Sequence, residues 1–222
     1  MAGVAAEFDA NTPFHALPLA VIDTETTGRD PARGDRVIEI AVVYVDAGEV
    51  TSRHALLVDP AMPIPKDSTA VHGIRDTDVK GKPRWDGIAR EVLALVRGRV
   101  PVAYNANFDR SFVFAEMRRA GIPATDDPAL PPAMRTNVDW IDPLVWARAK
   151  QPQAKGFKLG EVTARLGIDL TNAHRATDDA EAAARVLLAL LTDPKLTYGD
   201  VVQQQRQHSA AWEAVRATWR NR

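Results

Sequence analysis

The sequence predicts an α/β domain with a mixed, mainly five-stranded sheet and helices on both faces. The apolar run "LAVI" (residues 19–22) is typical of a buried strand. Residues 36–60 indicate two more strands joined at Asp46, Ala47 and Gly48, a connection too short for anything but an antiparallel hairpin. Further along the chain, strand-like segments alternate with helical patterns, which is typical of helices packed on a sheet.

The elements around this hairpin follow from apolar periodicity and from breaker residues. Residues 1–17 show no regular pattern, and we expect a flexible segment. After a proline-rich, irregular stretch, the spacing of Ile88, Val92, Leu95 and Val96 predicts an amphipathic helix. Residues 99–104 return to a strand. Residues 109–120 predict a helix that ends at Gly121.

The second half of the chain is predicted to be mainly helical. Four prolines make residues 122–137 a loop, and residues 138–150 predict a short strand followed by a helix. Another helix ends at Gly167, and Thr177 is the expected N-cap of the last helix of the domain. The inward face of that last helix is predicted to consist of small and apolar residues, namely Ala180, Ala183, Ala184, Leu187 and Leu191.

We expect the domain to span residues 18–193 and an amphipathic helical tail to follow at residues 194–222. The apolar residues of the tail fall close to one helix face: Val201, Trp212, Val215 and Trp219. Two interpretations stay open at this point. The tail covers the body of its own chain, or it docks on a second copy or another protein partner.

Composition excludes several classes of protein and site. The 28 basic and 29 acidic residues nearly cancel, so no global positive field indicates nucleic acid as a partner. The absence of cysteine rules out disulfides and thiolate metal sites. No apolar run approaches the roughly 20 residues of a membrane span. The first twenty residues lack the pattern of a signal peptide, so we expect a cytoplasmic protein without a membrane partner.

Two carboxylates mark the end of the first predicted strand. Asp23 and Glu25 are two residues apart, so they share a face of the strand within about 7 Å and repel each other. A bound metal ion would relieve this repulsion. The alternative is a loop cap at Asp23 and a solvated Glu25, the usual outcome for an isolated D-x-E pattern.

Further candidate residues stand where a sheet enzyme places its site. Asp109 lies just past a strand, at the start of a helix, which is the edge where α/β folds bind ligands. Asp179 lies in the first turn of the last core helix, where a carboxylate also complements the helix dipole. His174 precedes it by five residues, although a lone loop histidine is usually only solvated.

Together, "DTETTG" (23–28), "HGI" (72–74), "NANFD" (105–109) and "HRATDD" (174–179) resemble the motifs of the DnaQ-like exonucleases. These form the DEDDh branch of the 3'-5' exonucleases, with a ribonuclease H-like fold. The resemblance runs from about Leu19 to Leu191. The tyrosine branch would place Tyr at position 175, which is Arg here. One departure is that the usual A-H-N tripeptide reads Ala103, Tyr104 and Asn105.

The resemblance implies a metal-dependent site. Asp23, Glu25, Asp109 and Asp179 would bind two Mg²⁺ or Mn²⁺ ions, and His174 would be the general base. Carboxylate oxygens suit these cations better than zinc or copper. A histidine with an ordinary pKa near 6.5 is neutral yet basic at working pH. On this interpretation, the five residues are the catalytic set.

The resemblance also implies contacts to the terminal nucleotide, and each has a plain structural alternative. The implied substrate-binding residues are Thr26, His72, Gly73, Ile74, Asn107 and Phe108. Ile74 and Phe108 could equally be packing residues, and Asn107 could cap a helix. Arg148, Lys150 and Lys155, together with Lys158 and Arg165, form a basic stretch that either tracks a nucleic-acid strand or is only a solvated face.

The expected function is therefore a 3'-5' exonuclease that releases nucleoside 5'-monophosphates from the free 3' end of nucleic acid. DNA is favoured, and the strand is expected to be single. The same chemistry on RNA, in trimming or in degrading oligoribonucleotides, is the first alternative, because no motif reads the 2'-hydroxyl. An inert nucleic-acid-binding module and a nucleotidase acting on free nucleotides are the other two.

Overall fold

The computed structural model describes residues 1–169 and 175–220, with side chains as far as Thr218. The strands are β1 (Leu19–Thr26), β2 (Val37–Asp46), β3 (Glu49–Leu57) and β4 (Val100–Val102). The α-helices are α1 (Lys66–His72), α2 (Asp76–Val79), α3 (Trp85–Leu95), α4 (Asn107–Arg119), α5 (Pro143–Lys150), α6 (Leu159–Leu166), α7 (Ala176–Leu190) and α8 (Tyr198–Arg220). Short 3₁₀ helices occupy Phe14–Ala16, Pro31–Arg33 and Pro132–Met134.

The sheet is mixed, with strand order β3-β2-β1-β4. β2 is antiparallel to both β1 and β3, whereas β4 is parallel to β1. The predicted hairpin between β2 and β3 is confirmed. Asp46 pairs with Glu49, and the two residues between them, Ala47 and Gly48, both have positive φ angles, of 51° and 80°. Positive φ at both positions is the backbone of a type I′ turn, whose twist suits a two-residue hairpin.

The predicted fifth strand is wrong, because the described part of the sheet contains four. Residues 138–142 make only one bridge to β4, between Val102 and Ile141. The chain then enters α5 at once, because the Asp142 side chain accepts the Leu144 N–H as an N-cap and Pro143 occupies the first helical position. One bridge is therefore all that this segment can add to the sheet.

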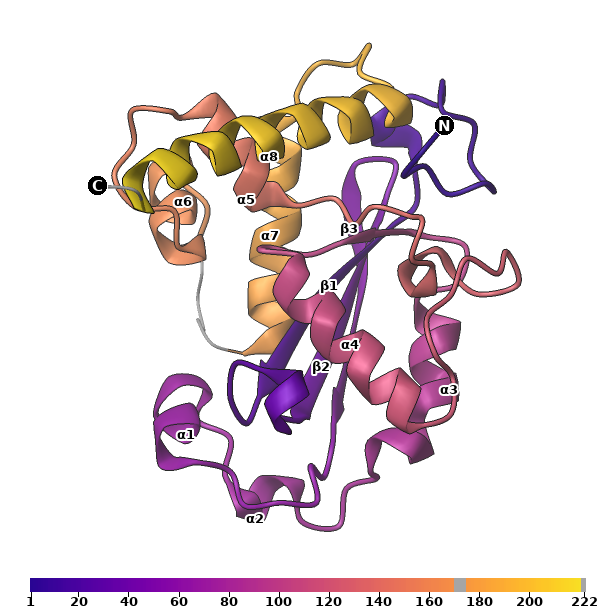
Figure 1. The fold of residues 1–222 in the computed structure, drawn as a ribbon, viewed down its shortest axis with the longest axis vertical. Helices are drawn as coiled ribbons and strands as arrows, with labels where there is room; N and C mark the ends of the chain where they lie inside the picture. Colours follow the sequence, from indigo (N-terminus) through magenta and orange to yellow (C-terminus); the bar gives the residue numbers. More distant parts are fainter. Residues whose placement is uncertain (170–174, 221–222) are drawn as a thin grey trace.

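Helices cover both faces of the sheet, as predicted (Figure 1). On one face, Leu19, Val21 and Val43 belong to a core cluster that includes α7. On the other face, Ala20 and Ile22 pack in a second cluster with α3 and α4. Consecutive residues of β1 thus pack in the two clusters on opposite faces of the sheet, as the alternation of side chains along a strand requires. A strand buried on both faces explains why "LAVI" is apolar throughout.

The inward face of α7 also matches its prediction, but the start of the helix does not. Ala180, Ala183, Ala184 and Leu187 are at most 2% exposed, and the fifth predicted residue, Leu191, is the C-cap and is partly buried against the same core. The small side chains of the three alanines let the helix approach β1 and β2 closely. The expected N-cap was wrong: the N-cap is Arg175, and Thr177 lies inside the first turn.

The first seventeen residues, expected to be flexible, pack against the start of α8 and the sheet. Pro13 forms a bridge with Thr197, and the Ala5 N–H donates to the Tyr198 hydroxyl at 3.2 Å. Phe14 and Leu17 are buried in the same core as α7. These contacts hold residues 1–17 against the C-terminal part of the chain.

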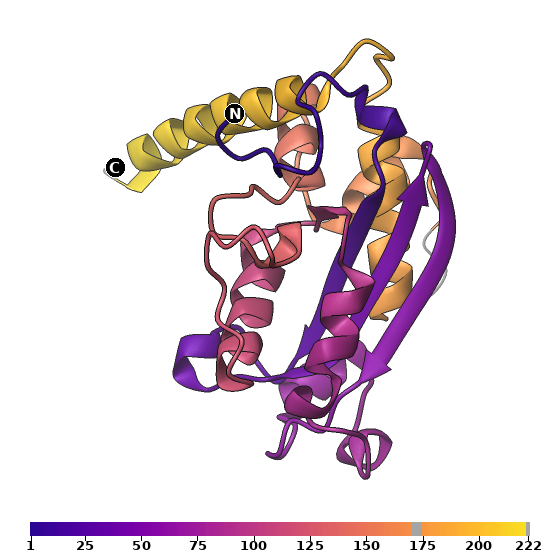
Figure 2. The same cartoon turned by 90° about the vertical axis from the view of Figure 1, so that its right-hand side faces the viewer.

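The final helix, α8, begins inside the core and ends outside it. Tyr198, Val201 and Val202 are at most 1% exposed. Trp212 is partly buried under the Arg148 guanidinium, which lies 4.6 Å from its ring centre, whereas Val215 is 44% exposed. Figure 2 shows the C-terminal half of the helix leaving the body. Neither this 23-residue helix nor another helix in the described residues is both long and apolar enough to cross a membrane.

We expect two truncations of α8 to differ strongly in their effect on stability. Deleting residues 198–222 removes three core side chains and should lower the free energy of unfolding by more than about 4 kcal/mol, since each large cavity costs about 2 to 5 kcal/mol. In residues 211–218, where side chains are described, all are partly buried or exposed, so deleting residues 211–222 should leave the melting temperature within a few degrees. Thermal unfolding followed by circular dichroism measures both. Equal melting temperatures for the two truncations would contradict this assignment of the core.

Candidate metal centre and cleft

Three carboxylates converge where β1 ends and α7 begins. Asp23 and Glu25 project from β1 on the face that packs against α7, and Asp179 comes from the first turn of α7. One oxygen from each of the three lies within 4.8 Å of the other two. If all three side chains were ionised at this distance, they would repel one another strongly.

Asp109 lies beside these three, close enough for its charge to raise the pKa values of Asp23 and Glu25. β4 pairs with β1 only as far as Val21, so the edge of β1 is open beyond that residue. Asp109, in the first turn of α4, fills this edge. Its Oδ1 accepts the Thr24 backbone N–H at 2.9 Å and the Thr24 hydroxyl at 2.8 Å. Thr24, the residue between the two acids of the D-x-E motif, thus holds the fourth acid, Asp109, in place.

Burial and mutual repulsion raise the pKa values of these acids. Burial, followed by the charges of Asp109 and Glu25, raises the pKa of Asp23 well above its usual value. Burial, followed by the charges of Asp179 and Glu39, raises the pKa of Glu25 to about 8. Burial raises the pKa of Asp109 to about 7, although the Thr24 hydrogen bonds oppose that rise. Without an added cation, the site therefore favours protonated carboxyls.

This donor set fits a hard divalent cation. All the candidate ligands are carboxylate oxygens, the ligand type that Mg²⁺ and Mn²⁺ prefer. Arg175 lowers the pKa of Glu25, but its effect is smaller than those of the neighbouring acids that raise it. A divalent cation would supply the missing positive charge and let the carboxyls ionise together.

A cleft of about 790 Å³ opens beside the acids. Its walls come from the end of β1 and the following loop, from α1 and from the start of α4. They are formed by Thr24, Glu25, Thr26, Thr27, Gly28, Arg29, Pro65, Asp67, Ser68, Val71, His72, Asn105 and Phe108. Three of the residues predicted to bind substrate, Thr26, His72 and Phe108, therefore line it.

The local contacts of these three residues define what they present. The Thr26 hydroxyl donates to the Gly28 carbonyl at 2.6 Å. His72 Nδ1 lies 3.0 Å from the Ile74 N–H and accepts it, which leaves the ring proton on Nε2. Phe108 packs on Phe112 with 4.9 Å between ring centres and also contributes to the cleft wall. Phe108 is thus both a packing residue and part of the cleft wall.

The other three predicted substrate residues are not among those that line the cleft. Gly73 is the left-handed C-cap of α1, with φ 75°. Ile74 is 3% exposed and packs in a small separate cluster around Ile38, so core packing accounts for it. Asn107 is the first residue of α4 and faces a neighbouring hollow formed with α5 and α8. In its place, Asn105, which has a positive φ of 62°, lines the cleft.

The structure adds two residues that the sequence interpretation missed. Thr24 positions Asp109, but its only signal in the sequence is its place between Asp23 and Glu25. Glu39 is 2% exposed and belongs to β2, directly opposite Glu25 in the antiparallel register. A lone carboxylate inside the apolar run "VIEIAVV" is the signal that could have identified it.

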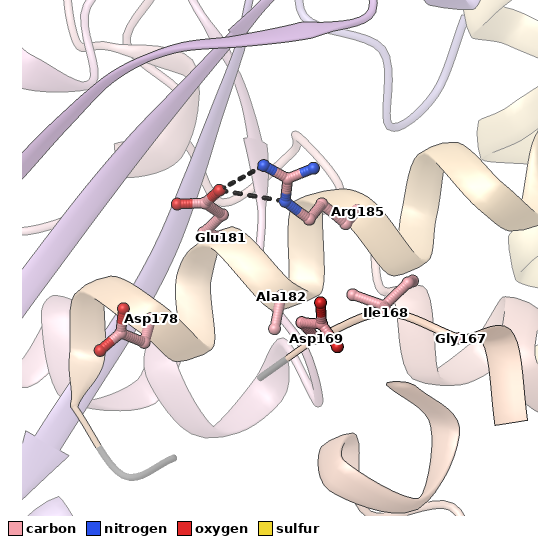
Figure 3. A pocket seen from close by; sticks show the side chains of 7 residues that line it. All are labelled: Gly167, Ile168, Asp169, Asp178, Glu181, Ala182 and Arg185. Atoms are coloured by element: carbon pink, nitrogen blue, oxygen red, sulfur yellow. Dashed lines mark hydrogen bonds and ion pairs between the residues drawn. The ribbon is translucent and has the colours of Figure 1, made fainter. Parts of the chain in front are cut away.

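The predicted base, His174, lies outside the described residues. On the other side of that gap, adjacent acids of α7 face different ways. Asp179 joins the carboxylate cluster, whereas Asp178 lines a different hollow together with Glu181 and Arg185 (Figure 3). In that hollow, the Arg185 guanidinium donates to Glu181 at 2.6 Å. Asp178 and Asp179 therefore serve different surfaces of the molecule.

Comparisons with known proteins agree with this architecture. Residues 20–187 match the exonuclease family RNase_T. The chain is 33% identical over 173 residues to 3'-5' exonuclease DinG of Bacillus subtilis, covering 78% of this chain and 17% of the relative. It is 34% identical over 207 residues to the DNA polymerase III subunit epsilon-like protein of Rhodobacter capsulatus, covering 90% of this chain and 28% of the relative. The chain thus spans less than a third of either relative.

Two solved structures share the fold. Exonuclease X in complex with 5' overhanging duplex DNA superposes with a TM-score of 0.64 at 24% identity, covering 84% of this chain and 99% of the other. Exonuclease I of E. coli with a dT13 oligonucleotide gives a TM-score of 0.67 at 22% identity, covering 81% and 42%. The family match spans most of the chain, and the neighbours have the ribonuclease H-like fold. The chain belongs to the RNase_T exonuclease family, in the group of DnaQ-like 3'-5' exonucleases.

Proposed function

We propose that this chain is a metal-dependent 3'-5' exonuclease that removes nucleoside 5'-monophosphates from a free, single-stranded 3' end of DNA. The observation that carries the proposal is the approach of Asp23, Glu25 and Asp179 to within 4.8 Å beside an open cleft. A structural role would not need three repelling carboxylates at one point. Asp109, held by Thr24, completes the proposed set of ligands.

The proposed chemistry is hydrolysis of the last phosphodiester bond. A water molecule attacks the phosphorus atom, the bond to the leaving 3' oxygen breaks, and His174 takes the proton of the water. Two Mg²⁺ or Mn²⁺ ions held by the four carboxylates would stabilise the charge that develops on the phosphate oxygens. Phe108 of α4 and His72 of α1, which both line the cleft, would contact the terminal nucleotide.

DNA is favoured over RNA because of the relatives that resemble this chain. The epsilon-like protein and several PolC-type relatives are named for DNA polymerase III. The fold alone does not discriminate, since a 3'-exonuclease that recognises a histone mRNA stem-loop superposes with a TM-score of 0.65. Selectivity would depend on contacts around one sugar hydroxyl.

Cleavage of matched oligonucleotides tests this proposal directly. DNA and RNA of one sequence, labelled at the 5' end, would be offered as single strands, as duplexes and as duplexes with a 3' mispair, with Mg²⁺, Mn²⁺ or EDTA. We expect a ladder that shortens from the 3' end, fastest on single-stranded DNA and absent in EDTA. Hydrolysis of free mononucleotides alone would favour a nucleotidase. Binding of the strand without cleavage would favour an inert module.

Replacing His174 with alanine should slow the chemical step by roughly 10² to 10⁴, the usual worth of a general base. The metal ligands remain, so we expect Mn²⁺ to bind with nearly unchanged affinity. Single-turnover cleavage gives the rate, and titration with Mn²⁺ followed by electron paramagnetic resonance gives the affinity. Loss of Mn²⁺ binding in this variant would identify His174 as a ligand and would remove it from the role of base.

A further inference from the structure

Glu39 is a buried acid beside the proposed metal ligands that the chemistry above does not use. It lies on β2, one of the two inner strands of the described sheet, is 2% exposed, and faces Glu25 across the antiparallel pair. Its negative charge contributes to raising the pKa values of Asp23 and Glu25. An acid at this position therefore adds to the repulsion in the site, so its presence there needs a separate explanation.

Both oxygens of Glu39 are directed to the start of α7. Oε1 accepts a hydrogen bond from the Arg175 guanidinium at 3.1 Å, and Oε2 accepts the backbone N–H of Ala176 at 3.3 Å. Arg175 is the N-cap residue and Ala176 is the first residue of the helix. One side chain of the sheet thus contacts the two residues at which α7 begins.

These contacts replace a missing cap. The first N–H groups of a helix have no partner inside the helix, and the N-cap side chain usually accepts one of them. Arginine has only donors, and the Arg175 side chain makes no capping bond. The Glu39 carboxylate accepts the Ala176 N–H instead and places a negative charge at the positive end of the helix dipole. The cap of α7 is therefore supplied by a strand 137 residues away in sequence.

The start of α7 determines where Asp179 lies. The Asp179 N–H donates to the Arg175 carbonyl at 3.0 Å, in the first turn of the helix. A displacement of Arg175 would therefore shift Asp179 relative to Asp23 and Glu25. Repulsion from those two carboxylates acts on Asp179, and the Glu39 contacts hold the helix against it.

We propose that Glu39 and Arg175 form a positioning pair that fixes the first turn of α7, and with it Asp179, in the metal site. The inference rests on the proposed function, in which Asp179 is a metal ligand. Neither residue touches substrate or metal in this assignment. Because Arg175 compensates its charge, Glu39 supplies the cap without leaving an additional unpaired anion beside Glu25.

Substitutions of the pair, alone and together, test the inference in the full chain. The variants are Glu39→Gln, Arg175→Gln and the double substitution, with Arg175→Lys as the conservative change. The matched control is Glu181→Gln, which breaks the Arg53–Glu181 ion pair, another link between the sheet and α7, away from the carboxylates. The readouts are kcat and KM on a single-stranded DNA oligonucleotide, Mn²⁺ affinity by electron paramagnetic resonance, and amide hydrogen exchange in residues 176–183.

We expect each single substitution to lower kcat roughly 10- to 100-fold, the usual effect of removing a residue that orients a metal ligand. KM should stay nearly constant. The double variant should be no slower than the worse single variant, because the two residues act as one unit. In the single and double variants, amide exchange in the first turn of α7 should be faster than in the wild type. Arg175→Lys should keep part of the kcat that Arg175→Gln loses. The control, Glu181→Gln, should have the kcat and KM of the wild type.

Other results would overturn the inference, each in a distinct way. Abolished Mn²⁺ binding in Glu39→Gln with normal binding in Arg175→Gln would make Glu39 a ligand. A raised KM in Arg175→Gln alone would make Arg175 a substrate contact. Wild-type kcat in both variants would leave only a structural role. If Glu39→Gln does not fold, Arg175→Gln still tests the pair. The Arg175 side chain is 54% exposed, so its replacement should not prevent folding. An inactive wild type would instead contradict the proposed function.

Discussion

Substituting alanine for Asp23, Glu25, Asp109 or Asp179 is expected to reduce Mg²⁺-dependent cleavage roughly a hundredfold or more. Each change removes a proposed metal ligand from a site that depends on charge stabilisation of the phosphate. The fold should persist, because each change also removes a source of repulsion. Steady-state cleavage of a labelled single-stranded DNA oligonucleotide measures the loss, and circular dichroism checks the fold.

The chain offers a matched control for this series. Asp178 is the immediate neighbour of Asp179 but lines the hollow in Figure 3 on another side of α7. Asp178→Ala makes the same chemical change one residue away and should keep nearly full activity. Near-normal cleavage by any two of the four ligand variants, or an equal loss in Asp178→Ala, would invalidate the assignment of the site.

The second large effect concerns the metal-free protein, whose stability should fall as pH rises from about 5 to 8. The pKa of Glu25 rises from 4.5 to about 8 on folding, and that of Asp109 from 3.8 to about 7. Between those values, the folded state holds protons that the unfolded state has released. Stability therefore decreases with pH, by about 1.4 kcal/mol per pH unit for each such proton.

Thermal unfolding in EDTA at a series of pH values measures this dependence. Glu25→Gln removes one of the groups that titrate, so its melting temperature should fall less steeply with pH than that of the wild type. Mg²⁺ added at pH 8 should restore stability to the wild type, because it binds the folded state. A wild-type melting temperature that rises steadily from pH 5 to 8 in EDTA would show that the acids are not held together in solution.

Local patterns in the sequence were enough to predict several parts of this protein. The period of two along a strand places Asp23 and Glu25 on one face, and the two-residue connection at Ala47 and Gly48 requires a hairpin. The small residues of α7, such as Ala180 and Ala184, indicate a helix that packs closely on a sheet. Each of these inferences depends on residues that are neighbours in the sequence, where backbone geometry alone restricts the outcome.

The remaining features depend on contacts between distant residues. The Thr24 to Asp109 hydrogen bonds span 85 residues, and no local rule predicts that a threonine hydroxyl meets that carboxylate. The cap of α7 was assigned to Thr177 because capping propensity is a local rule, whereas Glu39 supplies it from the sheet. The predicted fifth strand was wrong for the opposite reason. Its apolar residues fit a strand, but the N-cap at Asp142 ends the pairing after one bridge.

The bond between Ala5 and the Tyr198 hydroxyl has a consequence for the order in which the chain folds on the ribosome. The two residues are 193 apart in sequence, so this contact closes a loop that contains all four strands of the described sheet. Synthesis proceeds from the N-terminus, and Tyr198 leaves the exit tunnel after every strand and every preceding helix. Until then, Phe14 and Leu17 lack the α8 residues of their core cluster. The nascent protein thus exposes this apolar surface until α8 has emerged, a stage at which chaperones bind and partly folded chains aggregate.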